Sequence, residues 1–452
     1  MHSIRWRAAL SQQWLRPAFS WTGTIDVTPH RFLTTTQDER SDEKRASALV
    51  APKRPLNILF FGSSAIAIPV LDALKEAQAA SAPTTLAKGY PLVGELEVVC
   101  PPAKRTREKK ATILDYAESS KLPVHTLPPK MDFRMTNYTM PTMSSSGNTF
   151  DLGVVISFGY FIHPDMIDAM PMGMINAHGS LLPKFRGASP IQHAILHGEK
   201  TTGITVTTIH PKVIDLGRVL DQSEIPIHPD ATYATLVDEL GEVARKSVID
   251  VLANWDEKYT QSKDQADLLQ NTASLPNHLR HAGKILSHGP LARAMWSQKT
   301  AKQIYDNWRA LAGFVPFYTY FKPRPVDDLP EGVKPPPASL MRQQRMILRE
   351  AVGYALPGSR SLLQYSPHQL DENAIPDSTT PGKIEVDNLF KVDRAPNGVI
   401  RVRCRDGVDV LFTAVQFEGD KVMDTVKFGT WLKTNRILDP YVHDEPEPTT
   451  QA

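Results

Sequence analysis

The chain has 452 residues, of which 22% are charged and 41% hydrophobic, and its formal net charge is +2. At about 100 to 200 residues per domain, this length predicts two or three domains. The composition is that of a globular protein and excludes a chain that is disordered throughout. The small net charge excludes a strong global field, so any nucleic-acid binding must come from local clusters of cations.

Two further features narrow the class of protein. No run of about 18 or more apolar residues occurs, whereas a helix that crosses a bilayer needs about 20, so we expect no membrane span. The only cysteines, Cys100 and Cys404, are far apart and lack metal-ligand spacing. This argues against a disulfide framework and against structural zinc, and it favours a reducing compartment with no metal cofactor.

Residues 1–45 differ from the rest of the chain. Arginines alternate with tryptophan, leucine and phenylalanine there, and no acidic residue occurs before Asp26. The pattern is typical of an organellar transit peptide, with a disordered basic arm as the alternative. A transit peptide could be cleaved in the region 31–36, and the predicted location is then the mitochondrial matrix.

The next segment predicts alternating strands and helices. A strand at 56–61 is followed by Gly62 and by a helix over 69–78, without the Gly-x-Gly-x-x-Gly pattern of a dinucleotide site. Further strands are expected at 96–100, 122–125 and 152–157, and a helix at 111–120. Such apolar, β-branched runs between helices predict an α/β fold with a doubly wound, mostly parallel sheet that is covered on both sides.

Two segments of this half stand out by composition. Residues 128–149 are rich in Met, Pro, Thr, Ser and Asn, and we interpret them as a surface insertion without chemistry of its own. The loop 101–110 holds five cations and one anion. Taken alone, that loop favours a solvated face. Its cations are Lys104, Arg105, Arg107, Lys109 and Lys110.

The second half predicts helices and then short strands. Apolar stripes at helical spacing occur over 232–255 and 300–311 and indicate helices that pack on a core. A proline-rich passage, 323–337, indicates a connection between domains. Strands expected at 399–403 and 408–413 predict a small β-barrel.

Three arginines alternate along the first of these barrel strands, Arg401, Arg403 and Arg405, and therefore share one face. A row of cations suits the phosphate backbone of a nucleic acid. A sheet edge protected by charge would look the same.

These elements predict the following organisation: a transit peptide or disordered arm at 1–45, a catalytic domain at 55–260, a linker and helical connection at 261–339, a β-barrel domain at 340–440 and a disordered tail at 441–452.

Three side chains indicate chemistry. Asn176 and His178 follow a predicted strand, and Asp215 stands in a later short loop. When an amine attacks a formyl carbonyl, the oxygen gains negative charge and the nitrogen positive charge. An amide can stabilise the oxygen, and an imidazole oriented by a carboxylate can move protons near neutral pH. The trio therefore predicts acyl transfer without a covalent intermediate, although Asn-x-His alone is common by chance.

The chain resembles the methionyl-tRNA formyltransferase family. The motifs that carry the resemblance are Asn57–Pro69 (NILFFGSSAIAIP), Asn176–Gln192 (NAHGSLLPKFRGASPIQ), Thr202–Val206 (TGITV) and Ile214–Gly217 (IDLG). With gaps, the resemblance extends to about residue 438.

The resemblance implies transfer of a formyl group from 10-formyltetrahydrofolate to the amino group of initiator methionyl-tRNA. Asn176, His178 and Asp215 would be the catalytic residues. The folate co-substrate would lie against Ser180, Leu181, Leu182 and Pro183. The tRNA would contact the cations of the loop 101–110 together with Arg401 and Arg403, and we expect a monomer.

Two departures from the family pattern leave alternatives open. The second loop reads Asp215-Leu-Gly-Arg218 where the family has Asp-Thr-Gly-Asp, and the first glycine loop lacks an acidic residue. A protein that binds tRNA but has lost catalysis is therefore one alternative. A second is a formyltransferase for a small amine such as glycinamide ribonucleotide, although such enzymes usually lack an added barrel.

Overall fold

The computed structural model describes residues 51–79, 88–102, 113–270, 281–287, 289–322, 343–356, 359, 362, 381–387, 394–435, 437, 440 and 442–444. The predicted transit peptide therefore lies outside the described residues. The same holds for the proline-rich passage 323–337 and for most of the basic loop 101–110.

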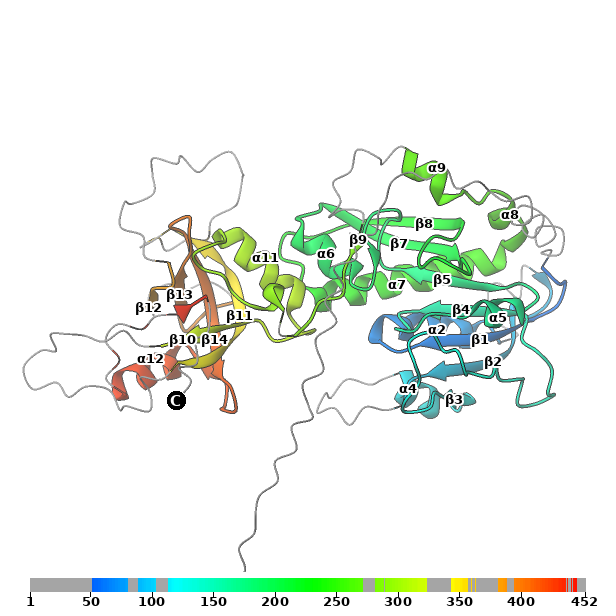
Figure 1. The fold of residues 1–452 in the computed structure, drawn as a ribbon, viewed down its shortest axis with the longest axis horizontal. Coiled ribbons are helices and arrows are strands. Elements are labelled where there is room, and N and C mark those ends of the chain that lie inside the picture. The colour runs from blue at the N-terminus through cyan, green and yellow to red at the C-terminus, as the bar shows by residue number, and fades with distance from the viewer. Residues whose placement is uncertain are drawn as a thin grey trace, which may run out of the picture. The chain divides into compact units, whose positions relative to one another are not determined.

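The first part of the chain forms a seven-stranded sheet in the order β3-β2-β1-β4-β5-β7-β8 (Figure 1). The five strands from β3 to β5 are parallel, whereas β7 and β8 are antiparallel to their neighbours. The strands are β1 Leu56–Gly62, β2 Val93–Cys100, β3 Val124–Thr126, β4 Leu152–Ile156, β5 Met174–His178, β7 Thr201–Thr208 and β8 Val219–Pro226. The predicted doubly wound, mostly parallel sheet is confirmed.

The alternation of side chains along β1 explains why its sequence is apolar throughout. Ile58 and Phe60 belong to one buried cluster, and Leu59 and Phe61 belong to another on the opposite face. The first cluster includes three helices: α2 Ile68–Glu76, α4 Ile113–Ser119 and α7 Tyr233–Ala253. Helix α2 has a proline in its first turn, a position that proline tolerates because no backbone donor is needed there.

The second face is covered mainly by irregular chain. Helix α5 (Pro164–Asp168) is short, and the segment 128–149 contributes the buried Met135 and Met143. Most residues of this segment are exposed, and its two buried methionines also contribute to the core. Methionine suits this role because its flexible side chain fills irregular gaps.

A buried carboxylate holds the same segment to the sheet. Glu97 on β2 is fully buried and accepts hydrogen bonds from the backbone N and the Oγ of Ser144, at 2.6 and 2.9 Å. Its Oε2 also lies 2.6 Å from Nε2 of His125. The carboxylate is thus paired by groups from β3 and from the segment 128–149.

The last part of the chain forms an antiparallel sheet in the order β12-β13-β14-β11-β10-β16, with β15 beside β14 (Figure 1). The strands are β10 Tyr318–Phe321, β11 Gln344–Ala355, β12 Ile384–Asp387, β13 Val399–Arg403, β14 Asp409–Phe417, β15 Met423–Asp424 and β16 Val442–His443. The sheet curves into a half-barrel. Two backbone hydrogen bonds link its end strands, from Val442 to Gly382 and from Ile384 to Pro440, at 3.0 and 3.2 Å.

Two strands of this sheet come from segments that the sequence placed elsewhere. Strand β10 lies in the predicted helical connection 261–339, yet it pairs with β11. Strand β16 lies at the start of the predicted disordered tail, yet it pairs with β10. Neither strand is long enough to show a pattern of its own.

The remaining elements are α6 Pro190–Leu196, α8 Trp255–Thr260, α9 Gln265–Gln270, α11 Ala301–Leu311, α12 Thr425–Thr434, the 3-10 turns η1 Ala65–Ala67 and η2 Pro290–Ala292, and the two-residue strands β6 Arg186–Gly187 and β9 His281–Ala282. The helices predicted over 232–255 and 300–311 are confirmed as α7 and α11. No helix among the described residues is long and apolar enough to cross a membrane.

Both cysteines are buried and unbonded. Burial raises the pKa of the Cys100 thiol to about 11, so this group is a thiol at neutral pH. The cysteines are core residues of the two sheets, Cys100 at the end of β2 and Cys404 just after β13.

Candidate active site

Strand β5 carries two of the three predicted catalytic residues. Asn176 and His178 are two positions apart on it, so their side chains lie on the same face of the sheet. Val155 of β4 pairs with Asn176, and Thr205 of β7 pairs with His178. Asn176 is the middle residue of β5 and His178 its last, so both lie within the strand rather than after it as predicted. They are near the carboxyl edge, at which parallel α/β sheets bind their ligands.

Asp215 comes to this pair from the loop between β7 and β8. Its Oδ1 lies 3.7 Å from Nδ1 of His178 and accepts a 3.4 Å hydrogen bond from Nδ2 of Asn176. Its Oδ2 accepts a 3.1 Å hydrogen bond from the backbone N of Gly187. The structure therefore brings the three predicted residues together.

The imidazole of His178 is oriented from both sides. Its Nε2 lies 3.1 Å from the carbonyl oxygen of Phe185, which can only accept, so Nε2 carries the hydrogen. Its Nδ1 faces the carboxylate of Asp215. The side chains of His178 and Asp215 are only 7% and 11% exposed, so water screens their interaction weakly. A carboxylate thus faces the ring nitrogen that Phe185 leaves open.

The loop after β5 contains the four residues predicted to line a folate pocket, and they divide into two kinds. Ser180 and Leu182 are buried and stabilise the loop. The Oγ of Ser180 donates to the carbonyl of Lys184 at 2.7 Å, and the backbone N of Leu182 donates to Oγ1 of Thr205 at 3.0 Å. Leu181 and Pro183 are half-buried. Only the latter two offer side-chain surface to a ligand.

Sequence reasoning missed the backbone groups that complete the site. The carbonyl of Phe185 and the amide of Gly187 orient His178 and Asp215, and no side-chain pattern reports them. Gly217 has a further role, because a Cβ at this position would lie 1.6 Å from the carbonyl oxygen of Thr208. In the sequence, the only indication of this close approach is that Gly217 stands two positions after the predicted catalytic residue Asp215.

A cluster of serines at the ends of two neighbouring strands was also missed. At the carboxyl ends of β1 and β4, Oγ of Ser64 donates to Oγ of Ser157 at 2.8 Å, and Oγ of Ser63 donates to the carbonyl of Ser157. The strand order changes direction between β1 and β4, which is where doubly wound folds bind ligands. These hydroxyls therefore extend the polar edge beyond β5.

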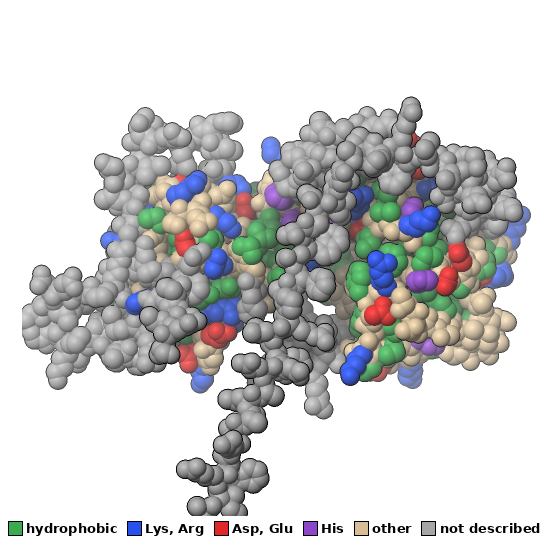
Figure 2. Space-filling view, in the orientation of Figure 1, with side chains coloured by type: hydrophobic (Ala, Val, Ile, Leu, Met, Phe, Trp, Pro, Cys, Tyr) green, Lys and Arg blue, Asp and Glu red, His purple; other side chains and the backbone are tan. Residues whose placement is uncertain are grey.

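Most of the residues predicted to contact tRNA cannot be placed in the site. Five of them lie outside the described residues: Lys104, Arg105, Arg107, Lys109 and Lys110. On the face shown in Figure 2, the described Lys and Arg side chains are scattered among acidic, polar and hydrophobic ones. Within the described ranges, no cluster of His, Cys, Asp and Glu has the arrangement of a metal site.

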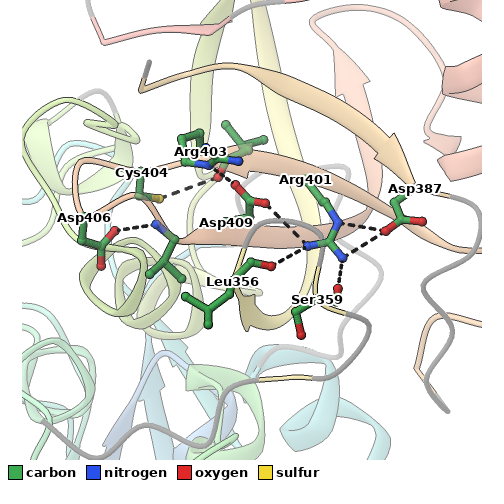
Figure 3. Close-up of polar contacts among 10 residues, drawn as sticks. Leu356, Ser359, Asp387, Arg401, Arg403, Cys404, Asp406 and Asp409 are labelled. Atoms are coloured by element: carbon green, nitrogen blue, oxygen red, sulfur yellow. Dashed lines mark hydrogen bonds and ion pairs between the residues drawn. The ribbon is translucent and has the colours of Figure 1, made fainter. Parts of the chain in front are cut away.

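The prediction for Arg401 is wrong. Its side chain is 2% exposed and forms ion pairs with Asp387 at 3.0 Å and Asp409 at 3.5 Å (Figure 3). Its guanidinium also donates to the backbone carbonyls of Leu356 and Ser359. Arg403 is 16% exposed and pairs with the other oxygen of Asp409. Both cations are paired on the face of β13 opposite to the core residues Ile400 and Val402, and Arg401 is covered there, so the two do not form an exposed row of charges for phosphates.

Comparisons with known proteins agree with this arrangement. Residues 103–252, which include all three candidate catalytic residues, match the family model described as formyl transferase. The mitochondrial methionyl-tRNA formyltransferase of Homo sapiens is 31% identical over 270 residues, which are 60% of this chain and 60% of that protein. That of Saccharomyces cerevisiae is 33% identical over 205 residues, or 44% of this chain and 49% of that protein.

The chain thus spans about three fifths of the length of its human relative. Among solved structures, a sugar 3N-formyl transferase crystallised with dTDP and 5-N-formyl-THF has a TM-score of 0.40 and 15% identity, over 81% of this chain and 99% of that one. By the family model and the curated relatives, residues 103–252 are similar to formyl transferases, and the chain is similar to mitochondrial methionyl-tRNA formyltransferases.

Proposed function

We propose that this protein transfers a formyl group from 10-formyltetrahydrofolate to the α-amino group of methionyl-tRNA, for initiation of translation in the mitochondrial matrix. The observation that carries the proposal is the meeting of Asn176, His178 and Asp215 at the carboxyl edge of the sheet. The similarity to mitochondrial methionyl-tRNA formyltransferases supports the choice of acceptor and compartment.

The geometry assigns a role to each residue. The amine nitrogen attacks the formyl carbon, a C–N bond forms, and the carbonyl oxygen becomes negative. Nδ2 of Asn176 and a proton on Nδ1 of His178 can donate to that oxygen. The carboxylate of Asp215 stabilises the protonated ring and can accept a proton from the attacking amine.

The second half of the reaction restores the site. The bond from the formyl carbon to N10 of the folate breaks, and N10 takes up the proton that the amine released. The products are tetrahydrofolate and formylmethionyl-tRNA, so protons and atoms balance without a metal or a redox partner. Nε2 of His178 remains bonded to Phe185, which leaves Nδ1 as the nitrogen that faces the chemistry.

Placement of the two substrates follows from the loops around the trio. The folate would lie against the half-buried Leu181 and Pro183. The tRNA acceptor end would approach from the basic loop 101–110, and the half-barrel domain would hold the tRNA by residues other than Arg401. The proposal takes the enzyme as a monomer.

The test measures formyl incorporation into methionyl-tRNA by the purified wild type, His178→Ala and His228→Ala. His228 is exposed and lies away from the trio, so its replacement is the matched control. We expect His178→Ala to lose about 10²- to 10⁴-fold in kcat while its affinity for tRNA changes less than about twofold. Equal turnover in His178→Ala and wild type would contradict the assigned role.

Two other outcomes identify the alternatives. A wild-type protein that binds folate and tRNA but transfers no formyl group would be a degenerate binding protein. Formylation of glycinamide ribonucleotide in preference to methionyl-tRNA would place the chain among formyltransferases for small amines.

A further inference from the structure

The loop that carries Asp215 adopts a conformation that its own sequence does not favour. Asp215 has φ of +55°. This is the left-handed region of the backbone, which is unfavourable in free energy for residues other than glycine. Two positions later, Gly217 runs directly against the backbone of Thr208. A loop of this kind persists only when surrounding groups hold it, so the contacts of the loop decide where the carboxylate lies.

One such contact is made by Arg218. Its Nε donates to Oγ of Ser262 at 2.8 Å, and its Nη2 donates to the carbonyl oxygen of Ser262 at 2.9 Å. Ser262 is itself fixed, because its Oγ donates to the carbonyl of Tyr259 at the end of α8, at 2.6 Å. The planar guanidinium of Arg218 therefore binds Ser262 through two hydrogen bonds, a geometry that lysine cannot reproduce.

The backbone continues the same attachment. The amide of Val219 donates to the carbonyl of Lys263 at 2.8 Å, and the amide of Lys263 donates back to Val219 at 3.1 Å. These bonds join the start of β8 to the segment that follows α8. The segment 262–265 is thus tied to the chain immediately after the Asp215 loop.

A second side chain reaches the loop from the same segment. Gln265 is completely buried, and its Nε2 donates to the carbonyl oxygen of Gly217 at 2.9 Å. Its Oε1 makes no hydrogen bond with any described residue. A buried amide with one unused oxygen is costly, and the bond that it does make falls on the loop two residues from Asp215.

From these contacts we propose that Arg218 and Gln265 are positioning residues for Asp215. By tying residues 217 and 218 to the segment 262–265, they hold the carboxylate against His178 and Gly187. The proposal rests on the proposed function, because the value of a fixed carboxylate is that it orients His178 during formyl transfer. It also gives a role to Arg218, which departs from the acidic residue of the family pattern.

The test uses the full chain and four variants: Arg218→Ala, Arg218→Lys, Gln265→Met and Lys263→Ala. Lys263 lies in the same segment with an exposed side chain, so Lys263→Ala is the matched control. The measurements are kcat, KM for each substrate, the pH profile of kcat and thermal unfolding. Since a displacement of about 1 Å can cost about 10²-fold, we expect kcat to fall about 10- to 100-fold in Arg218→Ala and Gln265→Met.

A positioning role predicts a specific pattern in these data. KM for both substrates should stay within about twofold, the pH profile of kcat should shift, and Arg218→Lys should recover part of the loss. Lys263→Ala should match the wild type in every measurement. Wild-type kcat and pH profile in both Arg218→Ala and Gln265→Met would overturn the proposal. Loss of folding in all the Arg218 and Gln265 variants would overturn it too, because the segment would then serve the fold alone.

A measurement independent of activity separates this inference from the proposed function. The amide of Gly187 is protected by Oδ2 of Asp215, so its hydrogen exchange reports the position of the carboxylate. We expect faster exchange at Gly187 in Arg218→Ala and Gln265→Met, and no change in Lys263→Ala. If the wild type transfers no formyl group, the proposed function fails, and unchanged exchange at Gly187 would still overturn the inference on its own.

Discussion

Asp215 reaches His178 because Gly217, at the base of the β7–β8 hairpin, lies so close to the backbone of Thr208 that no side chain would fit there. The amide of Arg218 donates to Oγ1 of Thr208 at 3.0 Å, and the amide of Thr208 donates to the carbonyl of Arg218 at the same distance. Gly217 lies inside this turn, where a Cβ would be 1.6 Å from the carbonyl oxygen of Thr208. At the scale of single residues, the absence of a Cβ at Gly217 therefore decides where the carboxylate of Asp215 lies.

Replacing Gly217 by Ala should displace the Asp215 loop, because the new Cβ cannot fit beside the Thr208 backbone. We expect formyl transfer to fall about 10²-fold, with a loss of about 1 to 3 kcal/mol in the free energy of unfolding. Steady-state kinetics and urea denaturation measure the two effects. Gly283→Ala is the control, since a Cβ at Gly283 has no heavy atom within 4 Å. Equal activity of Gly217→Ala and Gly283→Ala would refute this reading of the turn.

At the scale of elements, strand β13 shows how a pattern can be right while its interpretation is wrong. Alternation predicted correctly that β13 is a strand, and Ile400 and Val402 are buried as expected. Arg401 is buried as well, because the strand lies between β12 and β14 and meets the carboxylates of Asp387 and Asp409 there. A period of two tells which residues share a face, but not what covers that face.

Replacing Arg401 by Met should destabilise the half-barrel by about 3 to 5 kcal/mol, because it removes the buried cation that pairs with Asp387 and with Oδ2 of the buried Asp409. Oδ2 of Asp409 makes no hydrogen bond among the described residues, so it depends on this charge. Chemical denaturation measures the loss. Arg394→Met is the control, since the Arg394–Asp230 pair is exposed and is worth about 0 to 1 kcal/mol. A weaker affinity for tRNA without a loss of stability would return Arg401 to the tRNA-contact role.

At the scale of the whole molecule, contacts between segments far apart in the chain decide the architecture around the site. Strand β6, next to the trio, pairs with β9, which lies more than ninety residues later. His193 on α6 supports the same region, because its Nε2 donates to the carbonyl of Gly283 at 3.1 Å. Its Nδ1 has no hydrogen-bond partner among the described residues, so the neutral ring is the form that fits.

Stability should therefore depend on pH through His193. Burial lowers the pKa of this imidazole from its ordinary value of 6.5, and the nearby His281 adds to the effect. Because the unfolded chain takes up the proton more readily, the stabilisation is complete above pH 6.5 and is lost as the pH falls below it. Urea denaturation from pH 8 to about pH 5 should show this loss, reduced in His193→Gln. Identical pH slopes for the two proteins would contradict the prediction.

Local sequence patterns predicted much of this fold. The strand expected at 56–61 is β1 Leu56–Gly62, and the helix expected at 69–78 is α2 Ile68–Glu76. Both follow from short-range preferences, namely a β-branched and aromatic run and an apolar stripe after a proline. Strands β10 and β16 were missed because short strands acquire their structure from pairing with partners distant in sequence.

The candidate site divides in the same way. Asn176, His178 and Asp215 were found from sequence because acyl transfer needs those functional groups, and a motif records their identity. The carbonyl of Phe185 and the amide of Gly187 were not found, because backbone groups carry no sequence signature. The contacts of the Arg218 and Gln265 side chains were not found either, because their partners come close only in the folded chain. The distances among them exist only in the folded chain.

The sequence by itself determined the α/β class, the boundaries of its longer elements and the three side chains of the candidate site. These depend on local conformational preference and on chemical identity, which are properties of short stretches of chain. Only the tertiary structure decided that Asp215 reaches His178, that Arg401 is buried and that residues 128–149 contribute to the core on the second face of the sheet. Each of these depends on which distant segments meet, and burial and pairing are energies of the folded molecule as a whole.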